Sequence, residues 1–238
     1  MRISVCMATH NGERFIRAQI ESILPQLRKE DELIIIDDAS SDRTLEIIEQ
    51  EYSDPRMTIV AQRDNQGVIS TFEHALERAT RDIVFLADQD DVWRPHKVAR
   101  MIEVFAADPQ ISLVLSDCSI INASGDLMAS SRFVHTQFRA SAVRNIIRNQ
   151  YLGCSMAFRR EILDWCLPFP KDIPMHDMWI GIINQLVGRT EFIAEPLMSY
   201  RRHDKNASPH QKRASILQII RWRWSLIKNL AVVGMHSF

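Results

Sequence analysis

Carboxylates and other polar side chains follow three short apolar runs within the first 91 residues. Asp88-Gln89-Asp90-Asp91 follows the run 83–87, Asp37-Asp38 follows the run 33–36, and Thr9-His10-Asn11-Gly12-Glu13 follows the run 3–8. Carboxylates crowded in this way repel one another unless a cation lies near them. A bound Mg²⁺ or Mn²⁺ that carries a diphosphate would supply that charge. We therefore interpret residues 88–91 as a metal or phosphate site rather than a solvated turn.

Several of these polar residues also have structural interpretations. Ser40 and Asp42 stand just ahead of a predicted helix, and helix N-caps are the favoured interpretation of both. Asp91 stands four residues before Pro95 and is explained equally well as a turn or cap residue. The phosphate loops G-x-G-x-x-G and G-x-x-x-x-G-K-[ST] do not occur in the sequence, which disfavours a dinucleotide oxidoreductase or a P-loop enzyme.

The elements that must position these residues alternate between two hydrophobic patterns. Short apolar runs predict strands at 3–8, 33–36, 58–61, 83–87 and 111–115, and apolar spacing near 3.6 residues predicts helices at 13–24, 44–52, 69–79 and 97–107. This alternation is typical of parallel strands buried under helices, so we predict the α/β fold class. Ligands of open α/β sheets bind at the carboxyl ends of strands, where the polar residues are expected.

The alternating pattern loosens after about residue 118. A turn is predicted at 123–126, and a C-terminal helix is predicted from Gln211 to about Val232. We see no linker between separate folding units in the sequence. We therefore predict one domain at 1–208, with halves at 1–117 and 118–208, followed by a basic amphipathic helix within 209–238.

Composition places the chain among ordinary globular proteins, since it has 238 residues of which 46% are hydrophobic and 25% charged. Its four cysteines form no C-x-x-C pair, so we expect neither a zinc cluster nor a disulfide scaffold, and a reducing compartment. The first apolar run is too short for a signal peptide, and charges at Arg221, Arg223 and Lys228 interrupt the best candidate membrane span. These features predict a cytoplasmic location.

The C-terminal segment is basic although the whole chain has a net charge of −1. From Arg201 onward, eight Lys and Arg residues stand against one acid, Asp204, which favours an anionic partner. The expected apolar stripe consists of Ile216, Ile220, Ile227 and Leu230 with Trp222 and Trp224. Such a helix can lie peripherally on the inner face of an anionic cell membrane, or its stripe can pack on the domain. Nucleic acid is disfavoured as a partner because the basic residues lie in one terminal segment.

Three motifs together resemble those of family 2 glycosyltransferases. Asp37-Asp38-Ala39-Ser40-Ser41-Asp42-Arg43-Thr44 resembles the family's D-D-x-S-x-D-x-T block, Asp88-Gln89-Asp90 resembles its D-x-D metal motif, and Thr9-His10-Asn11-Gly12 resembles its T-Y-N-x turn. Ala8 stands where proline is commoner, and His10 stands where tyrosine is. The string from Phe85 to Trp93, with Gly153-Cys154 and Tyr200-Arg201-Arg202-His203, is similar to the rhamnosyltransferase-like branch. The resemblance covers roughly residues 2–208.

The resemblance implies a GT-A fold and transfer of a sugar, with rhamnose the first candidate, from a nucleotide diphosphate donor with inversion at the anomeric carbon. It makes 1–117 the nucleotide-binding half and 118–208 the acceptor-side half. It implies that Ala8, Thr9, Asn11 and Glu13 cradle the nucleotide, that Asp38 binds the base, that Asp88 faces the ribose and diphosphate, and that Asp90 with His203 binds Mg²⁺ or Mn²⁺. The implied acceptor is a saccharide or a lipid-linked saccharide of a surface polysaccharide.

An inverting transfer needs a base that takes the proton of the acceptor hydroxyl. Asp177 matches the place of the family's catalytic acid residue, although His176 stands where the family usually has an acid. The resemblance puts Gly153, Cys154, His176 and Trp179 on the acceptor side. The structural alternative is that Asp177 caps the helix that runs to Leu186 after Pro174.

Other interpretations remain open at this point. Asp88-Gln89-Asp90-Asp91-Val92 also fits the D-x-D-x-[TV] motif of haloacid-dehalogenase-like phosphatases, whose nucleophile would be Asp88. A nucleotide-sugar-binding module without catalysis is the non-enzymatic alternative. The sequence Gln218 to Trp222 matches the Q-x-x-R-W pattern of processive synthases, and we interpret it as a coincidence because those enzymes need membrane helices.

Overall fold

The computed structural model describes residues 1–133, 138–147, 149–204, 206 and 216–235. The strands are β1 (Ile3–Thr9), β2 (Glu32–Asp37), β3 (Met57–Ala61), β4 (Ile83–Asp88), β5 (Val92–Trp93), β6 (Ile111–Ile121), β7 (Leu127–Ala129), β8 (Met156–Arg159) and β9 (Arg189–Arg201). The helices are α1 (Ile16–Ile23), α2 (Thr44–Glu51), α3 (Val68–Leu76), α4 (Lys97–Ala107), α5 (Ala142–Ile147), α6 (Leu163–Cys166), α7 (His176–Val187) and α8 (Ile216–Met235). Single 3₁₀ turns are η1 (Leu24–Gln26), η2 (Gly153–Ser155) and η3 (Arg160–Ile162).

The strands form one mixed sheet in the order β3-β2-β1-β4-β8-β6-β9-β5, with β7 paired to β6. Strands β1 to β4 pair in parallel, which confirms the expected βαβ units of the first half. The second half joins the same sheet through β8, which is antiparallel to both β4 and β6. Because β6 and β9 also run parallel to each other, the carboxyl ends of β4, β6 and β9 face one edge of the sheet.

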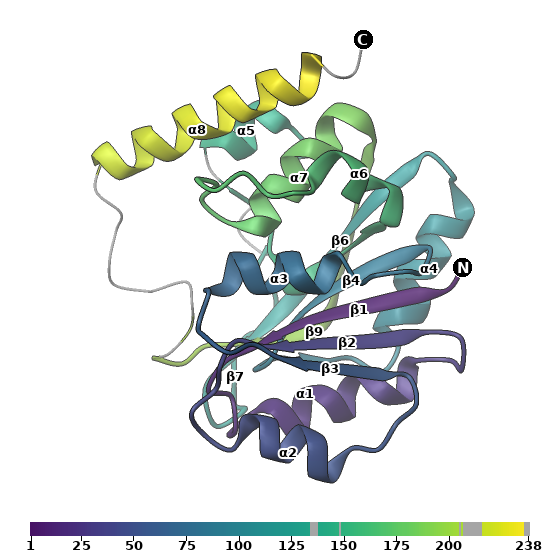
Figure 1. The fold of residues 1–238 in the computed structure, drawn as a ribbon. Coiled ribbons are helices and arrows are strands. Elements are labelled where there is room, and N and C mark those ends of the chain that lie inside the picture. The colour runs from purple at the N-terminus through teal and green to yellow at the C-terminus, as the bar shows by residue number, and fades with distance from the viewer. Residues whose placement is uncertain (134–137, 148, 205, 207–215, 236–238) are drawn as a thin grey trace.

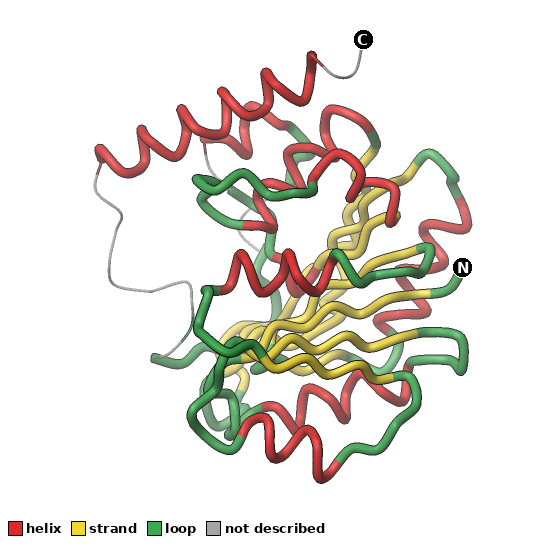
Figure 2. Tube along the Cα trace, in the orientation of Figure 1, coloured by secondary structure: helices red, strands yellow, loops and turns green. Residues whose placement is uncertain are grey.

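Helices cover both faces of the sheet, as Figures 1 and 2 show. The apolar side chains of β1 alternate between the two layers: Val5 and Met7 pack with α1, α2 and α4, whereas Cys6 packs with α3, α6 and α7. Strands buried on both faces are therefore almost continuously apolar, which explains why their sequence runs were easy to recognise.

The C-terminal helix α8 packs one of its faces on the domain (Figure 1). Leu226 is buried in the core cluster of the α7 layer, the Asn229 amide donates to Asp172 at 3.2 Å, and the Arg223 guanidinium donates to the Ile147 carbonyl at 3.0 Å. Within the described part of the chain, no helix is both long and apolar enough to cross a membrane. The side chain of Gln218, part of the Q-x-x-R-W match, lies outside what the structure describes.

Candidate functional site

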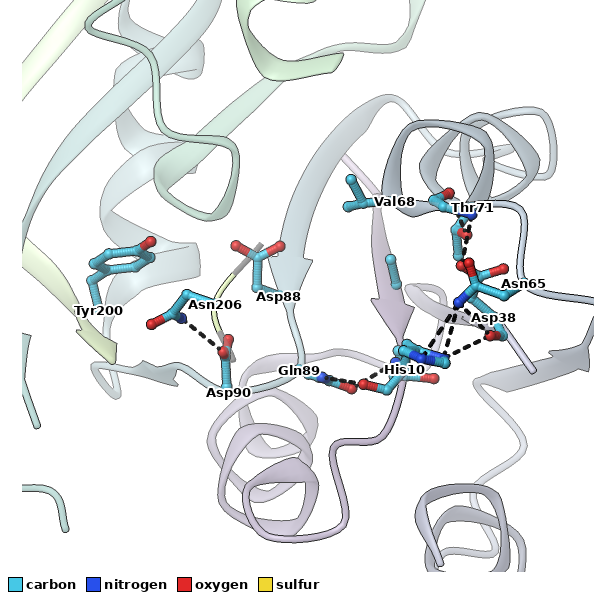
Figure 3. Close-up of a pocket in the computed structure, with 13 residues that line it drawn as sticks. His10, Asp38, Asn65, Val68, Thr71, Asp88, Gln89, Asp90, Tyr200 and Asn206 are labelled. Atoms are coloured by element: carbon cyan, nitrogen blue, oxygen red, sulfur yellow. Dashed lines mark hydrogen bonds between the residues drawn. The ribbon is translucent and has the colours of Figure 1, made fainter. Parts of the chain in front are cut away.

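A cavity of about 340 Å³ opens at the carboxyl ends of β1 and β4 (Figure 3). It is lined by Ala8, Thr9, His10, Asp38, Asn65, Gly67, Val68, Thr71, Asp88, Gln89, Asp90, Tyr200 and Asn206. The lining therefore unites the three polar strand ends singled out in the sequence with α3 and with the end of β9. The expected position of a ligand site in an α/β sheet is the position found here.

Asp88 and Asp91 lie in surroundings that disfavour their ionised forms. Burial raises the pKa of Asp88 to about 7, with further contributions from the charges of Asp90 and Asp177. Burial, with the charges of Asp90 and Asp88, also holds the pKa of Asp91 well above its usual range. Nearby negative charge therefore disfavours ionisation of Asp88 and of Asp91, and a cation would relieve this repulsion.

Asp90 is held by residues from the end of β9 and the segment after it. One of its carboxylate oxygens lies 2.6 Å from the His203 Nε2 atom and accepts a hydrogen bond from the Asn206 amide at 3.2 Å. The guanidinium of Arg201 donates to the Asp90 carbonyl at 2.7 Å, and the Arg201 backbone N–H donates to Asp91 at 2.9 Å. Asp91 is thus a buried residue that accepts a hydrogen bond from the backbone of β9, rather than a solvated turn residue. Asp90 and His203 are in contact, and metal binding by this pair stays a prediction.

These residues fit a divalent cation by the chemistry of their donor atoms. Asp88, Asp91 and Cys154 each offer a ligand atom, and these atoms lie within 4.8 Å of one another. One Asp91 oxygen is buried without a hydrogen-bond partner among the described residues. Carboxylate oxygens, as at Asp88 and Asp90, are the donors that Mg²⁺ and Mn²⁺ prefer, whereas the imidazole of His203 is a softer donor.

The residues expected to bind the nucleotide divide into two groups. Ala8, Thr9 and Asp38 line the cavity. Thr9 donates its hydroxyl to Asp37 at 2.8 Å, and the Asp38 carboxylate accepts the backbone N–H groups of Gln66 and Gly67 at 2.7 and 2.9 Å. Asp38 therefore shapes the loop before α3 as well as lining the cavity.

Asn11 and Glu13 are not among the residues that line the cavity. Asn11, with φ 49°, accepts the backbone N–H of Ser41 at 2.8 Å, and Glu13 accepts that of Arg43 at 3.1 Å. Both side chains brace the turn after β1 against the turn after β2. Contact of these two residues with the nucleotide stays a prediction, because their motif positions do not distinguish bracing from direct contact.

The N-cap interpretation of Ser40 and Asp42 is wrong, since α2 begins at Thr44 and Arg43 occupies the cap position. Ser40 donates its hydroxyl to Asp37, 2.6 Å away. Asp42 accepts the backbone N–H of Thr44 at 3.0 Å. This hydrogen bond forms a local turn, and Asp42 stands one residue before the N-cap residue Arg43.

Sequence reasoning missed several residues of the cavity, chiefly His10, Asn65 and Gln89. The His10 ring nitrogen Nδ1 lies 2.8 Å from the Asp38 carbonyl, and the Asn65 amide donates to the same carbonyl at 3.3 Å. Gln89 points toward the His10 backbone (Figure 3). The position of Gln89 at a strand end is the available signal, and the sequence gives Gln89 no role of its own within residues 88–91.

Asp177 lies in the first turn of α7. Its carboxylate accepts the backbone N–H of Gly153 at 3.1 Å and that of Met178 at 2.6 Å. Burial raises its pKa to about 6, and its charge is one of those that raise the pKa of Asp88. The N-cap position belongs to Met175, so the capping interpretation of Asp177 is wrong.

His176 and Trp179 flank Asp177 but have different surroundings. The His176 ring stacks on Phe72 with centroids 4.0 Å apart, and neither ring nitrogen has a hydrogen-bond partner among the described residues. Burial lowers the pKa of His176 to about 3, so the ring is neutral. Trp179 is buried in the core and donates its indole N–H to the Cys166 carbonyl at 3.1 Å, so its side chain does not form an acceptor surface.

The sequence of the chain is similar to sequences of known glycosyltransferases. A family model described as glycosyl transferase family 2 matches residues 4–166. An uncharacterized glycosyltransferase of Nostoc sp. is 28% identical, over 90% of this chain and 68% of the relative. The putative teichuronic acid biosynthesis glycosyltransferase TuaG of Bacillus subtilis is also 28% identical, over 90% of this chain and 84% of that protein. The dTDP-rhamnosyl transferase RfbG of Shigella flexneri is 25% identical, over 84% and 72%.

Solved structures match the whole fold. The structure of S. aureus TarS in complex with UDP-GlcNAc superposes with a TM-score of 0.75 and 20% identity, over 96% of this chain and 67% of that one. The mannosyltransferase PcManGT of Pyrobaculum calidifontis, in complex with GDP-Man and Mn²⁺, gives a TM-score of 0.63 at 20% identity, over 99% and 75%. These likenesses confirm the expected GT-A type fold.

Proposed function

The chain belongs to glycosyl transferase family 2, and we propose that it is a non-processive inverting transferase that moves a sugar from a nucleotide diphosphate donor to a saccharide or lipid-linked saccharide. One observation supports this proposal above the others: a single cavity at the carboxyl ends of β1 and β4 brings together Asp38, Asp88 and Asp90 of the family's motifs. Relatives named for teichuronic acid and for dTDP-rhamnosyl transfer support surface polysaccharide synthesis, with dTDP-rhamnose as the first donor to test.

On the donor side, we assign the nucleotide to the cavity lined by Ala8, Thr9, Asp38 and Asp88. His10 and Asn65 line the same cavity and join this assignment. We assign Mg²⁺ or Mn²⁺ to Asp90 and His203, beside Asp88, which agrees with the Mn²⁺ named in the PcManGT complex. When bound, the cation neutralises the charge that grows on the departing diphosphate.

On the acceptor side, Asp177 takes the proton of the acceptor hydroxyl while that oxygen forms a bond to the anomeric carbon. The bond from the anomeric carbon to the diphosphate breaks, and its electron pair leaves with the nucleotide diphosphate. A carboxyl with a pKa of about 6 is mostly ionised at pH 7 and still accepts a proton readily. Gly153 orients this carboxylate through its N–H, Cys154 continues the same turn, and the buried, neutral His176 ring lies beside Gly153.

We further propose that 1–208 carries the transferase site and that helix α8 within 209–238 attaches it to an anionic membrane on the cytoplasmic side. Opposite its packed face, Trp224 and Ile227 are 69% and 50% exposed, and the side chains of Arg221 and Lys228 are exposed with them. An exposed aromatic and aliphatic pair beside cations is typical of interfacial helices. Sedimentation with vesicles containing anionic lipid should retain the protein, Trp224→Ala/Ile227→Ala should weaken retention, and neutral vesicles should not retain either protein.

The experiment that tests the transferase proposal compares UDP, dTDP and GDP as ligands in thermal-shift and calorimetric titrations, with and without Mn²⁺. We expect one nucleotide to stabilise the wild-type protein with the metal, and we expect Asp90→Ala and His203→Ala to abolish the metal-dependent part. Donor turnover with saccharide acceptors then separates the transferase from a binding module. Absence of nucleotide binding, together with phosphate release that Asp88→Asn abolishes, would instead support the phosphatase alternative.

A further inference from the structure

Lys97 is a buried cation that the proposed chemistry leaves without a role. It is the first residue of α4, and its side chain is fully buried. Its ammonium group donates to the Cys154 carbonyl at 2.5 Å, lies 3.7 Å from the Met198 sulfur and lies 4.1 Å from the centre of the Trp93 ring. Burial of an ammonium group is costly unless other groups compensate it, so this arrangement calls for an explanation.

Part of the compensation comes from the metal loop, residues 88–91. Burial lowers the pKa of Lys97 to about 8, and the charges of Asp91 and Asp88 are among those that oppose this effect. Lys97 therefore remains mostly protonated at pH 7. Lys97 is thus a buried cation whose ammonium group contacts the Cys154 carbonyl.

That carbonyl belongs to the 3₁₀ turn η2, which also holds the candidate base. The preceding residue, Gly153, donates its N–H to the Asp177 carboxylate. A Cβ at Gly153 would lie 3.4 Å from the Asp177 Cβ and 3.2 Å from the His176 Nε2 atom, so the turn and the start of α7 are closely packed. The middle residue of the turn therefore contacts Lys97, and its first residue contacts Asp177.

We propose that Lys97 is a positioning residue that fixes η2 and, through the Gly153 amide, sets the place of the Asp177 carboxylate relative to the metal loop. Its effect on transfer rests on the proposed function. Lys97 contacts neither donor nor acceptor in this proposal, so its removal should misplace the base and leave the nucleotide cavity intact.

The first test is Lys97→Met, with the exposed Lys29→Met as the matched control. We expect kcat to fall about 10- to 100-fold, as for a slightly misplaced catalytic group, whereas the donor KM and the nucleotide Kd stay within about threefold. In the Asp177→Asn background, Lys97→Met should cause no further loss of kcat, because the base on which it acts is gone. An additive loss, or a loss of nucleotide affinity in place of kcat, would overturn the proposal.

The second test does not depend on turnover. Exchange of the Gly153 amide hydrogen, measured by NMR, should be at least about tenfold faster in Lys97→Met than in wild type or Lys29→Met. Unchanged exchange would overturn the proposal even if the wild-type protein showed no transferase activity. If Lys97→Met does not fold, Gly153→Ala is the alternative, because it disturbs the first residue of η2. This variant should lower kcat and retain the donor KM, and an unchanged kcat in Gly153→Ala would equally contradict the proposal.

Discussion

Gln89 and His10 form two reciprocal hydrogen bonds, each 2.8 Å long. The His10 backbone N–H donates to the Gln89 side-chain oxygen, and the Gln89 amide donates to the His10 carbonyl (Figure 3). The pair joins the loop after β1 to the loop after β4, which together form one wall of the cavity. The middle residue of the D-x-D motif is therefore a brace between two loops.

Loss of this brace should weaken nucleotide binding. In Gln89→Ala both hydrogen bonds disappear, and we expect the free energy of unfolding to fall by about 1–3 kcal/mol because each bond contributes roughly 0.5–1.5 kcal/mol. The loosened wall should also raise the Kd of the preferred nucleotide about tenfold. Calorimetric titration measures this Kd, with Gln66→Ala as the control. An unchanged Kd would show that the loops are held by other contacts.

A side chain at Gly12 should displace Gln89 and break the same pair of hydrogen bonds. A Cβ at Gly12 would lie 2.2 Å from the Gln89 Oε1 atom, so the Gln89 side chain must move, and loss of its two bonds to His10 costs about 1–3 kcal/mol. We therefore expect Gly12→Ala to lower the midpoint of thermal unfolding. In the Gln89→Ala background the same substitution should cost much less, because the clashing atoms are gone. Equal costs in the two backgrounds would place the strain elsewhere.

The pH dependence of transfer should report on Asp177. The base acts in its ionised form, and its pKa is about 6, so kcat should fall about tenfold per pH unit below pH 6 and level off above pH 7. Asp177→Asn should lower kcat by about 10²- to 10⁴-fold and abolish this acidic limb. Single-turnover rates from pH 5 to pH 8 measure both effects. If the acidic limb persists in Asp177→Asn at a near-normal rate, the base is another residue.

The first half of the fold was predictable because its signals are local. Each of the strands β1 to β4 is a short apolar run, and each following helix has apolar residues at helical spacing. The insertion of β8 between β4 and β6 was not predictable, because β8 has four residues and pairs with partners more than 40 positions earlier in the chain. No local pattern encodes such a sheet order.

The residues of the candidate site that belong to motifs were predictable from the sequence. The contacts by which side chains hold neighbouring loops in place were not. The motifs placed Asp38, Asp88 and Asp90 at one cavity. They did not reveal that Asn11 holds the neighbouring turn or that Lys97 is buried beneath η2. Those roles depend on which backbone groups lie within reach after folding, and residue type and spacing do not contain that information.

His176 should make the folded protein sensitive to acid. Its pKa is about 3 in the folded state and about 6.5 in an unfolded chain, so between these values the unfolded state binds a proton that the folded state does not. Stability therefore falls as pH falls through this range, and at pH 5 the loss from this one ring relative to pH 7 is about 2 kcal/mol.

His176→Phe keeps a ring against Phe72 but removes the titrating group. Chemical unfolding at pH 7 and pH 5 should therefore show a loss about 2 kcal/mol smaller for His176→Phe than for wild type. The half-exposed His74→Phe is the matched control and should retain the wild-type difference between the two pH values. Because burial raises the pKa of Asp177, that carboxyl changes stability with pH in the opposite sense, and it is present in all three proteins. If His176→Phe lost as much stability in acid as wild type, the folded protein would bind a proton at His176 as readily as the unfolded chain does.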